Sequence, residues 1–99
     1  METINVTTVN VDGKVCLGLR ADLPDSPPLL LAVADKGFVT CGFLNVEVAE
    51  KLGVAAAMVS GVRTLEDLLS AEVKAATTKA KNSGVDPGMR GSEALKHMS

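Results

Sequence analysis

The first part of the chain alternates apolar and polar residues, as strands with one buried face do. Within residues 3–11 the phase changes: Ile4 and Val6 share one face, and Val9 lies on the other. A strand keeps one phase unless an extra residue interrupts it, so the change predicts a bulge near Thr7–Thr8.

The dipeptide Asp12–Gly13 then predicts a two-residue hairpin turn, because both positions tolerate left-handed backbone conformations. In the strand that follows, Leu17 and Leu19 alternate with Cys16 and Gly18. This pattern predicts a half-buried strand. Cys16 lies on the face opposite the leucines, where we interpret it as a small residue on a packed or subunit-facing surface.

A proline-rich loop precedes a continuous apolar run, Leu29 to Ala34, which is typical of a strand covered on both faces. Asp35–Lys36–Gly37 predicts a short hairpin loop with the glycine in the left-handed region. Residues 38–41 form the returning strand.

Residues 40–45, Thr-Cys-Gly-Phe-Leu-Asn, predict a corner between this strand and a helix. Asn45 is a favourable N-cap, and Gly53 a natural stop. Leu44, Val48, Ala49 and Leu52 would form the apolar face of the helix. The short apolar run 54–59 then predicts a buried strand, and a strand–helix–strand order at this spacing predicts a parallel crossover.

After Thr64, which caps a helix with Asp67, apolar residues keep a helical period as far as Ala80, with a candidate break at Ser70–Ala71. Whether residues 64–83 form one helix or two elements stays open. Ser92 is expected to cap a last short helix. The chain is therefore expected to be one α+β domain, residues 1–99: N-terminal β-hairpins lead into a mixed sheet with a βαβ crossover and C-terminal helices. Residues 1–42 would be its β-rich part.

Composition adds a prediction about assembly. Apolar residues make up 46% of the chain but aromatic residues only 2%, so the core consists of aliphatic side chains. A short chain has little interior in which to bury them. We therefore expect some apolar surface to be buried between identical subunits.

Charge and motif content argue against several functions. The net charge is −2 and no basic cluster is present, so we expect no nucleic-acid partner. No apolar run reaches the roughly 20 residues of a membrane span, and no signal peptide is visible, which suggests a cytoplasmic protein without membrane contact. With two cysteines and one histidine, we expect neither a metal site nor a cofactor.

Cys41 is the first candidate for chemistry, because a nearby helix N-terminus would stabilise a thiolate. A thiol nucleophile also needs a base. His97, the single histidine, lies near the end of the chain, and Glu47 in the first helical turn opposes a thiolate. A structural role at a tight corner is the competing interpretation.

Arg63 is the second candidate, since it follows a predicted parallel strand, and ligands collect at the carboxyl ends of such strands. It would bind a carboxylate ligand, or else pair with Asp67 or with an acidic group of a partner subunit. Together with Asn45, the predicted ligand-binding candidates are Cys41, Asn45 and Arg63. The catalytic residues, if any, are not identified by the sequence.

Several short motifs, in order and spacing, resemble the YunC-like family of small bacterial and archaeal proteins, a domain of unknown function. The resemblance covers residues 31–95, and its motifs are Ala32 to Phe38, Cys41–Gly42 with Leu44, Gly61 to Thr64 with Leu68–Leu69, and Gly88–Met89 with Gly91 and Glu93 to Leu95. It implies that residues 1–42 are a β-rich oligomerisation region, which mediates tetramer formation, and that residues 43–99 are the α/β remainder. It implies no reaction or cofactor.

The sequence thus favours a homo-oligomeric domain that acts as a small-ligand or protein-binding module. An enzyme with Cys41 as a thiol nucleophile is the alternative, and a structural subunit of a larger assembly is a second alternative.

Overall fold

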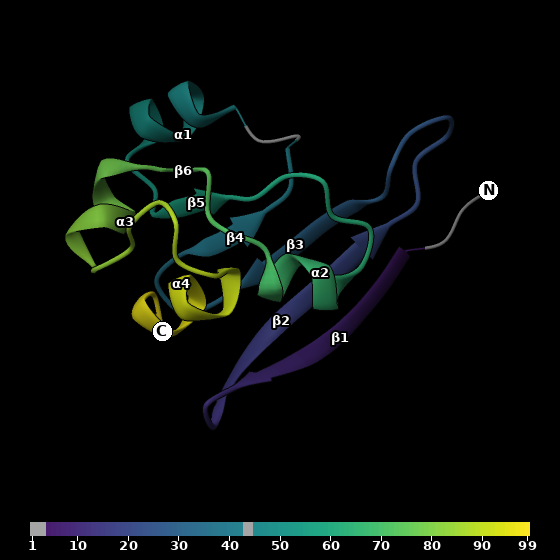
Figure 1. Ribbon diagram of the computed structural model, residues 1–99, viewed down its shortest axis with the longest axis horizontal. Helices are drawn as coiled ribbons and strands as arrows, with labels where there is room; N and C mark the ends of the chain where they lie inside the picture. Colours follow the sequence, from purple (N-terminus) through teal and green to yellow (C-terminus); the bar gives the residue numbers. More distant parts are fainter. Residues whose placement is uncertain (1–3, 43–44) are drawn as a thin grey trace.

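The computed structural model describes residues 4–42 and 45–99 (Figure 1). This part of the chain forms six strands and four helices. In chain order they are β1 (Ile4–Val11), β2 (Lys14–Ala21), β3 (Leu29–Val33), β4 (Phe38–Thr40), α1 (Val46–Leu52), β5 (Ala56–Met58), α2 (Leu65–Ser70), β6 (Ala75–Ala76), α3 (Thr78–Asn82) and α4 (Gly91–His97).

All six strands belong to one sheet, in which they lie side by side in the order of the sequence. Neighbouring strands are antiparallel except β4 and β5, which are parallel and are joined through α1. The predicted α+β fold, with N-terminal hairpins, a mixed sheet, a βαβ crossover and C-terminal helices, is therefore confirmed.

The first hairpin is regular along its whole length. Asp12 and Gly13 form its turn with φ angles of 50° and 83°, as a type I′ turn requires. Pairing runs from Val11 opposite Lys14 to Ile4 opposite Ala21 with no residue skipped. The predicted bulge near Thr7–Thr8 is therefore wrong. The apparent change of phase arises because β1 carries apolar side chains on both of its faces.

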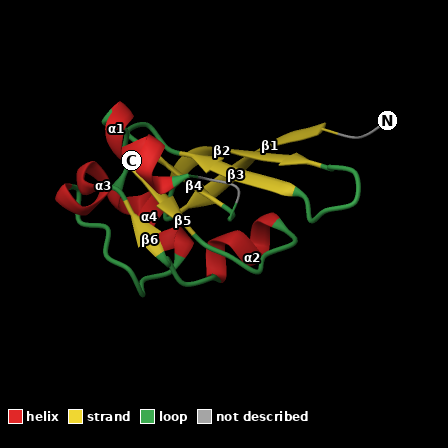
Figure 2. Cartoon of the chain, turned by 90° about the horizontal axis from the view of Figure 1, so that it is seen from above, coloured by secondary structure: helices red, strands yellow, loops and turns green. Residues whose placement is uncertain are grey.

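Helices α2 and α4 both pack on the same face of the sheet, and they also contact each other. The largest fully buried side chains include Leu30 of β3, Val39 of β4, Leu68 of α2 and Leu95 of α4. Figure 2 shows α2 on one side of the sheet and α1 on the other. The core therefore lies between the sheet and the helix pair α2–α4.

On β2 the small residues, rather than the leucines, point into this core. Cys16 is 3% exposed, whereas Leu17 is 45% exposed. A Cβ atom on Gly18 would lie 2.8 Å from Cγ2 of Val9 and 3.0 Å from Cδ1 of Leu65. The absence of a side chain thus lets α2 approach the sheet, and the interpretation of Cys16 as a small residue on a packed surface is confirmed.

Helix α1 has the predicted ends but not the predicted buried face. Asn45 caps it and Gly53, with φ of 73°, ends it. Ala49 is buried, but Val48 and Leu52 are largely exposed; Leu44 lies outside the described residues. The prediction of a full apolar face was wrong because this short helix, which packs against β5, turns only Ala49 into the interior.

Residues 64–83 contain a strand that the sequence pattern did not predict. After α2, Ala75 and Ala76 pair with Met58 and Ala57 of β5 as strand β6. Helix α2 ends at the candidate break, Ser70–Ala71, and residues 64–83 form separate elements. The helical period that was expected as far as Ala80 is interrupted by β6. Two alanines on a strand carry no alternation of apolar and polar residues, so no pattern distinguishes them from helix.

Two smaller predictions are also corrected. Gly37 does not have a positive φ; instead, a Cβ atom there would lie 2.6 Å from the carbonyl oxygen of Ala55. Glycine is needed for close approach rather than for the turn. The last helix begins after Arg90, whose N–H donates to Oε1 of Glu93 at 2.9 Å. Ser92 is not its cap.

Thr77, the residue that follows β6, is hydrogen-bonded through its side chain to the chain at the start of β5. Its side chain is buried, with the residue 1% exposed. Its Oγ1 donates to the carbonyl of Val54 at 2.7 Å and accepts from the N–H of Ala56 at 3.0 Å. A buried N–H group that loses its acceptor costs free energy, so this hydroxyl is an integral part of the sheet.

We predict that Thr77→Val lowers the free energy of unfolding by about 1–3 kcal/mol, because it leaves the N–H of Ala56 without this acceptor. Thr77→Ser, which retains the hydroxyl, is the matched control and should lose less. Urea unfolding at a fixed protein concentration measures both. The role of the hydroxyl would be refuted if the valine variant were as stable as the serine variant.

Glu50 of α1 holds the first turn of α3. Its Oε1 accepts from the N–H of Thr78 at 2.8 Å, and its Oε2 accepts from Oγ1 of Thr78 at 2.5 Å. These hydrogen bonds, first that from the Thr78 side chain, lower the pKa of the Glu50 carboxyl from its ordinary value. The carboxylate form is thus favoured in the folded chain.

A lowered folded-state pKa makes the contribution of Glu50 to stability complete above the unfolded value of about 4.3. The contribution is lost as the pH falls through the folded-state pKa. We predict that Glu50→Gln destabilises the protein at pH 7 and that the difference from wild type shrinks below about pH 4. Urea titrations from pH 7 to pH 3 test this, and a difference independent of pH would contradict it.

Candidate functional site

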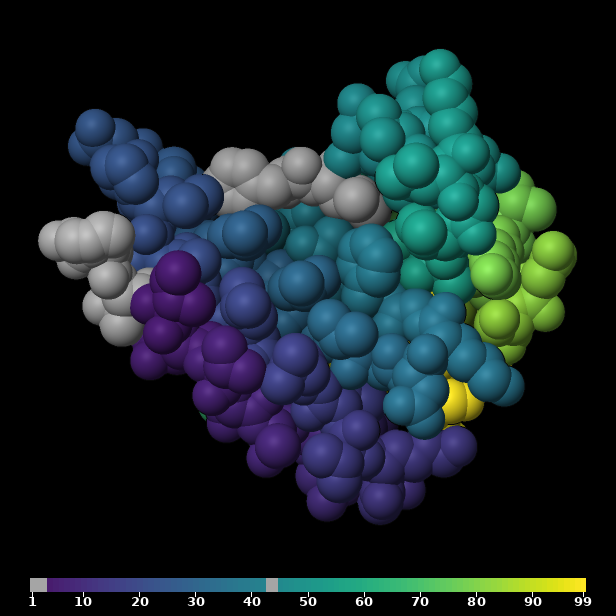
Figure 3. All heavy atoms as spheres, turned by 180° about the vertical axis from the view of Figure 1, so that it is seen from behind, coloured from purple at the N-terminus to yellow at the C-terminus, as the bar shows by residue number. Residues whose placement is uncertain are grey.

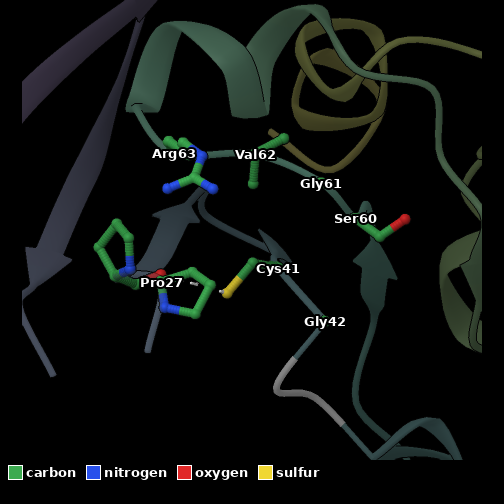
Figure 4. Close-up of a pocket in the computed structure, with 8 residues that line it drawn as sticks. Pro27, Cys41, Gly42, Ser60, Gly61, Val62 and Arg63 are labelled. Atoms are coloured by element: carbon green, nitrogen blue, oxygen red, sulfur yellow. Dashed lines mark hydrogen bonds between the residues drawn. The ribbon is translucent and has the colours of Figure 1, made fainter. Parts of the chain in front are cut away.

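A pocket of about 330 Å³ opens where β4 and β5 end (Figure 4). Because β4 and β5 are parallel and Thr40 pairs with Met58, both strands finish at the same edge of the sheet. The pocket is lined by the residues that follow the two strands and by the loop before β3: Pro27, Pro28, Cys41, Gly42, Ser60, Gly61, Val62 and Arg63.

Pairing of β3 with β4 explains why the two prolines are part of the pocket. These strands are antiparallel, with Leu31 opposite Thr40. The start of β3 therefore lies beside the end of β4, and the residues just before β3, Pro27 and Pro28, lie at the pocket. Three segments that are distant in the sequence thus meet at one edge of the sheet.

Cys41 forms part of the buried wall of the pocket. The residue is 5% exposed. Its Sγ accepts from the N–H of Leu30 at 3.5 Å and donates to the carbonyl of Pro28 at 4.0 Å. The thiol is therefore directed to β3 and its preceding loop, and its hydrogen bonds do not involve α1. This geometry differs from the helix-terminus thiolate that the sequence suggested.

Asn45 serves as a cap and does not line the pocket. Its Oδ1 accepts from the N–H of Glu47 at 3.0 Å and from the N–H of Val48 at 3.3 Å. Both bonds satisfy donors of the first turn of α1. Of the three predicted ligand-binding candidates, the structure brings together Cys41 and Arg63, and it places Asn45 elsewhere.

Arg63 lies at the pocket mouth, and its backbone is held on both sides. Its carbonyl accepts from Nη1 of Arg20 at 2.9 Å. Its N–H donates to Oδ2 of Asp67 at 3.2 Å. The predicted contact with Asp67 therefore exists, but it is made by the backbone. Within residues 4–42 and 45–99, the Arg63 guanidinium forms no ion pair. Figure 4 shows this guanidinium over Cys41 and Pro27.

The lining residues determine which chemistry is available. Among the eight of them, all in the described part of the chain, there is no carboxylate and no imidazole. His97 lies elsewhere, against Gly84, where an added Cβ would be 2.8 Å from its Nδ1. No group of three or more His, Cys, Asp or Glu side chains in the described residues is arranged to hold a metal ion. The side chains of the lining thus offer one thiol, one hydroxyl and one guanidinium as polar groups.

Sequence reasoning missed Ser60, Gly61 and the two prolines. Ser60 and Gly61 follow a predicted parallel strand, so the rule that ligands collect at carboxyl strand ends could have included them with Arg63. Pro27 and Pro28 had no such signal, because their position depends on the pairing of β3 with β4.

The four helices of the described chain have five to seven residues each. In the parts of the chain that the structure describes, none is long and apolar enough to cross a bilayer.

Comparison with known proteins places the chain in a family. The model of a domain of unknown function, DUF1805, matches residues 40–98, which is more than half of the chain. The uncharacterized protein YunC of Bacillus subtilis is 36% identical over 100 residues, covering 96% of this chain and 97% of YunC.

A crystal structure agrees with this result. The protein of unknown function TA1206 from Thermoplasma acidophilum superposes with a TM-score of 0.92 and is 34% identical, covering 99% of this chain and 95% of that one. The motifs that suggested a YunC-like protein are thus supported by a family model and by relatives matched over nearly the full length. The chain belongs to the DUF1805 family of YunC-like proteins.

Proposed function

We propose that this chain is the subunit of a homo-oligomer and that its pocket at the ends of β4 and β5 binds a small molecule. The observation that supports self-association is the apolar face of the sheet opposite α2 and α4. The pocket supports ligand binding. The two free cysteines, Cys16 and Cys41, suit a reducing compartment such as the cytoplasm, where we expect the protein to work.

The face opposite α2 and α4, called here the back face, carries exposed aliphatic side chains. Ile4 is 68% exposed and Leu17 is 45% exposed. Residues paired across neighbouring strands point to the same side, and the register connects Val6 with Leu19 and Leu19 with Leu31. Figure 3 shows this face as a broad surface of β1 to β4 beside the projecting α1.

A second copy of the chain is the occupant that we propose for the back face. β1 lies at the edge of the sheet, and none of its eight residues is charged. Charges that normally prevent strand edges and sheet faces from associating are thus missing at this place. Aliphatic faces without charge complement each other, and the resemblance to the YunC-like family implies that the N-terminal β-rich region forms a tetramer.

Ligand binding is supported by the position and size of the pocket. Small-molecule sites in proteins commonly have volumes of about 300–1,000 Å³ and lie where strands of α/β sheets end. The pocket of about 330 Å³ is at the small end of this range. It combines apolar walls with one guanidinium, that of Arg63, which is the composition that gives a site both affinity and orientation.

An enzyme that uses Cys41 as its nucleophile is the second candidate function, since this thiol lines the pocket. The burial of Cys41 and the hydrogen bonds of its Sγ to Leu30 and Pro28 argue for a structural role instead. The two functions predict different reactivity.

We predict that Leu17→Lys converts the oligomer to monomers, because a charged side chain on the back face would be buried without a partner in the assembly. Glu66→Lys is the matched control: Glu66 is exposed and belongs to α2, which covers the opposite face of the sheet, so its substitution should leave the assembly intact. Light scattering at micromolar concentration measures the mass. A monomeric wild type, or an unchanged oligomer of the Leu17 variant, would refute self-association through this face.

We also predict that iodoacetamide alkylates Cys41 in the native protein at least about tenfold more slowly than in the unfolded chain, because reagent access requires local opening of the structure. Peptide mass spectrometry after timed quenching distinguishes Cys41 from Cys16. Native alkylation of Cys41 as fast as in the unfolded chain would favour the nucleophile function instead.

A further inference from the structure

We infer that the pocket takes a small molecule in which a carboxylate adjoins a compact apolar group. This inference rests on the proposed function of the pocket as a ligand site and specifies the class of ligand. Three properties of the site support it: the charge of Arg63, the way in which the backbone of Arg63 is held, and the apolar remainder of the wall.

Arg63 supplies the only charged side chain among the eight lining residues, all of which are described. Two acidic side chains close to Arg63 have other partners. Oδ2 of Asp67 accepts from the Arg63 N–H, and Asp22 pairs with Nε of Arg20 at 3.1 Å. The lining itself thus carries one positive charge, that of Arg63, and an anion would complement it.

The backbone of Arg63 is fixed by two hydrogen bonds, one at its carbonyl and one at its N–H. A fixed backbone reduces the freedom that the side chain would lose when it binds an anion. The guanidinium presents planar N–H donors that match the two oxygens of a carboxylate. A carboxylate is thus favoured over an anion without that planar geometry.

Apart from the Ser60 hydroxyl and the Cys41 thiol, the rest of the wall is apolar, and it leaves space. Pro27 and Val62 contribute hydrocarbon, and Cys41 closes the inner side. Gly42 and Gly61 contribute no side chain, and a Cβ atom added to either would meet nothing within 4 Å. A short aliphatic or aromatic group could therefore lie beside the guanidinium, and a fully hydrated anion would leave these surfaces uncovered.

Benzoate and benzamide form a suitable pair of probes, because they share a ring and differ in the charge of the attached group. We expect benzoate, titrated into ¹⁵N-labelled protein at constant ionic strength, to shift the amide signals of Cys41, Gly42 and residues 60–63. Benzamide should bind at least about tenfold more weakly, as expected for the loss of one charge-assisted hydrogen-bonded pair. Inorganic phosphate should bind more weakly than benzoate, because it lacks the apolar group.

Two variants and one control assign the effect to Arg63. Arg63→Met keeps the aliphatic stem of this exposed residue and should weaken benzoate binding at least about tenfold, to the level of benzamide. Arg63→Lys keeps the charge but not the planar donors, so it should bind with intermediate affinity. Lys14→Met removes a positive charge at the β1–β2 turn, far from the pocket along β2, and should bind benzoate as wild type does.

The outcomes separate the two proposals. If benzamide binds as tightly as benzoate at these amides, or if Arg63→Met has no effect, the pocket is a ligand site but the carboxylate inference is wrong. Phosphate binding tighter than benzoate would also overturn the inference, because it would show that the apolar wall contributes nothing. If no probe shifts the pocket amides at millimolar concentration, both the inference and the proposed ligand-binding function fail.

Discussion

The parallel pairing of β4 with β5 is the constraint on which the sheet and the pocket depend. Each strand has three residues, and the pairing extends beyond them through Phe38 N–H to Ala55 and Val59 N–H to Thr40, at 3.1 and 2.9 Å. Parallel strands require a crossover connection, which α1 provides. They also end at one edge of the sheet, so the segments that follow diverge there and leave the cavity between them.

The same pair is stabilised from its outer side by short elements that depend on it. β6 adds two residues to β5, and the Thr77 hydroxyl bonds two backbone groups of the β5 segment. Glu50 connects α1 to the start of α3. Each of these elements is too short to be stable alone. They are therefore held in place by the crossover rather than by local propensity.

A second consequence follows from helices that cover only one face of β1 to β3. Glycines allow the close contacts on that side: Gly18 beneath α2, and Gly91, which faces the backbone of Leu68. The opposite face keeps its aliphatic side chains in the solvent, although burial of each is worth about 1.5–3 kcal/mol. Self-association would recover part of that free energy. The proposed ligand pocket lies at the ends of β4 and β5, whereas the side chains of the proposed subunit contact belong to β1 and β2.

Local signals in the sequence determined the turns and the ends of the helices. Asp12–Gly13, Asn45 with Gly53, and Thr64 with Asp67 act over a few residues, because dihedral preferences and capping bonds involve only neighbours. These positions were predicted and are present in the structure. The apolar run of β3 and the crossover around α1 were recognisable for the same reason, since their period and spacing lie within a short window.

Tertiary structure decided which face of each strand is buried and which residues meet at the site. Leu17 and Cys16 alternate equally well in either orientation, and only the packing of α2 over Gly18 makes the side of the small residues the core. Likewise, Arg63 and Cys41 could be proposed from their places after strands, but the contribution of Pro27 depends on the register of β3 against β4. Asn45 was also predicted as a ligand-binding residue, but its side chain accepts the N–H groups of the helix that it caps. Such choices depend on contacts between residues far apart in the chain, which no local pattern encodes.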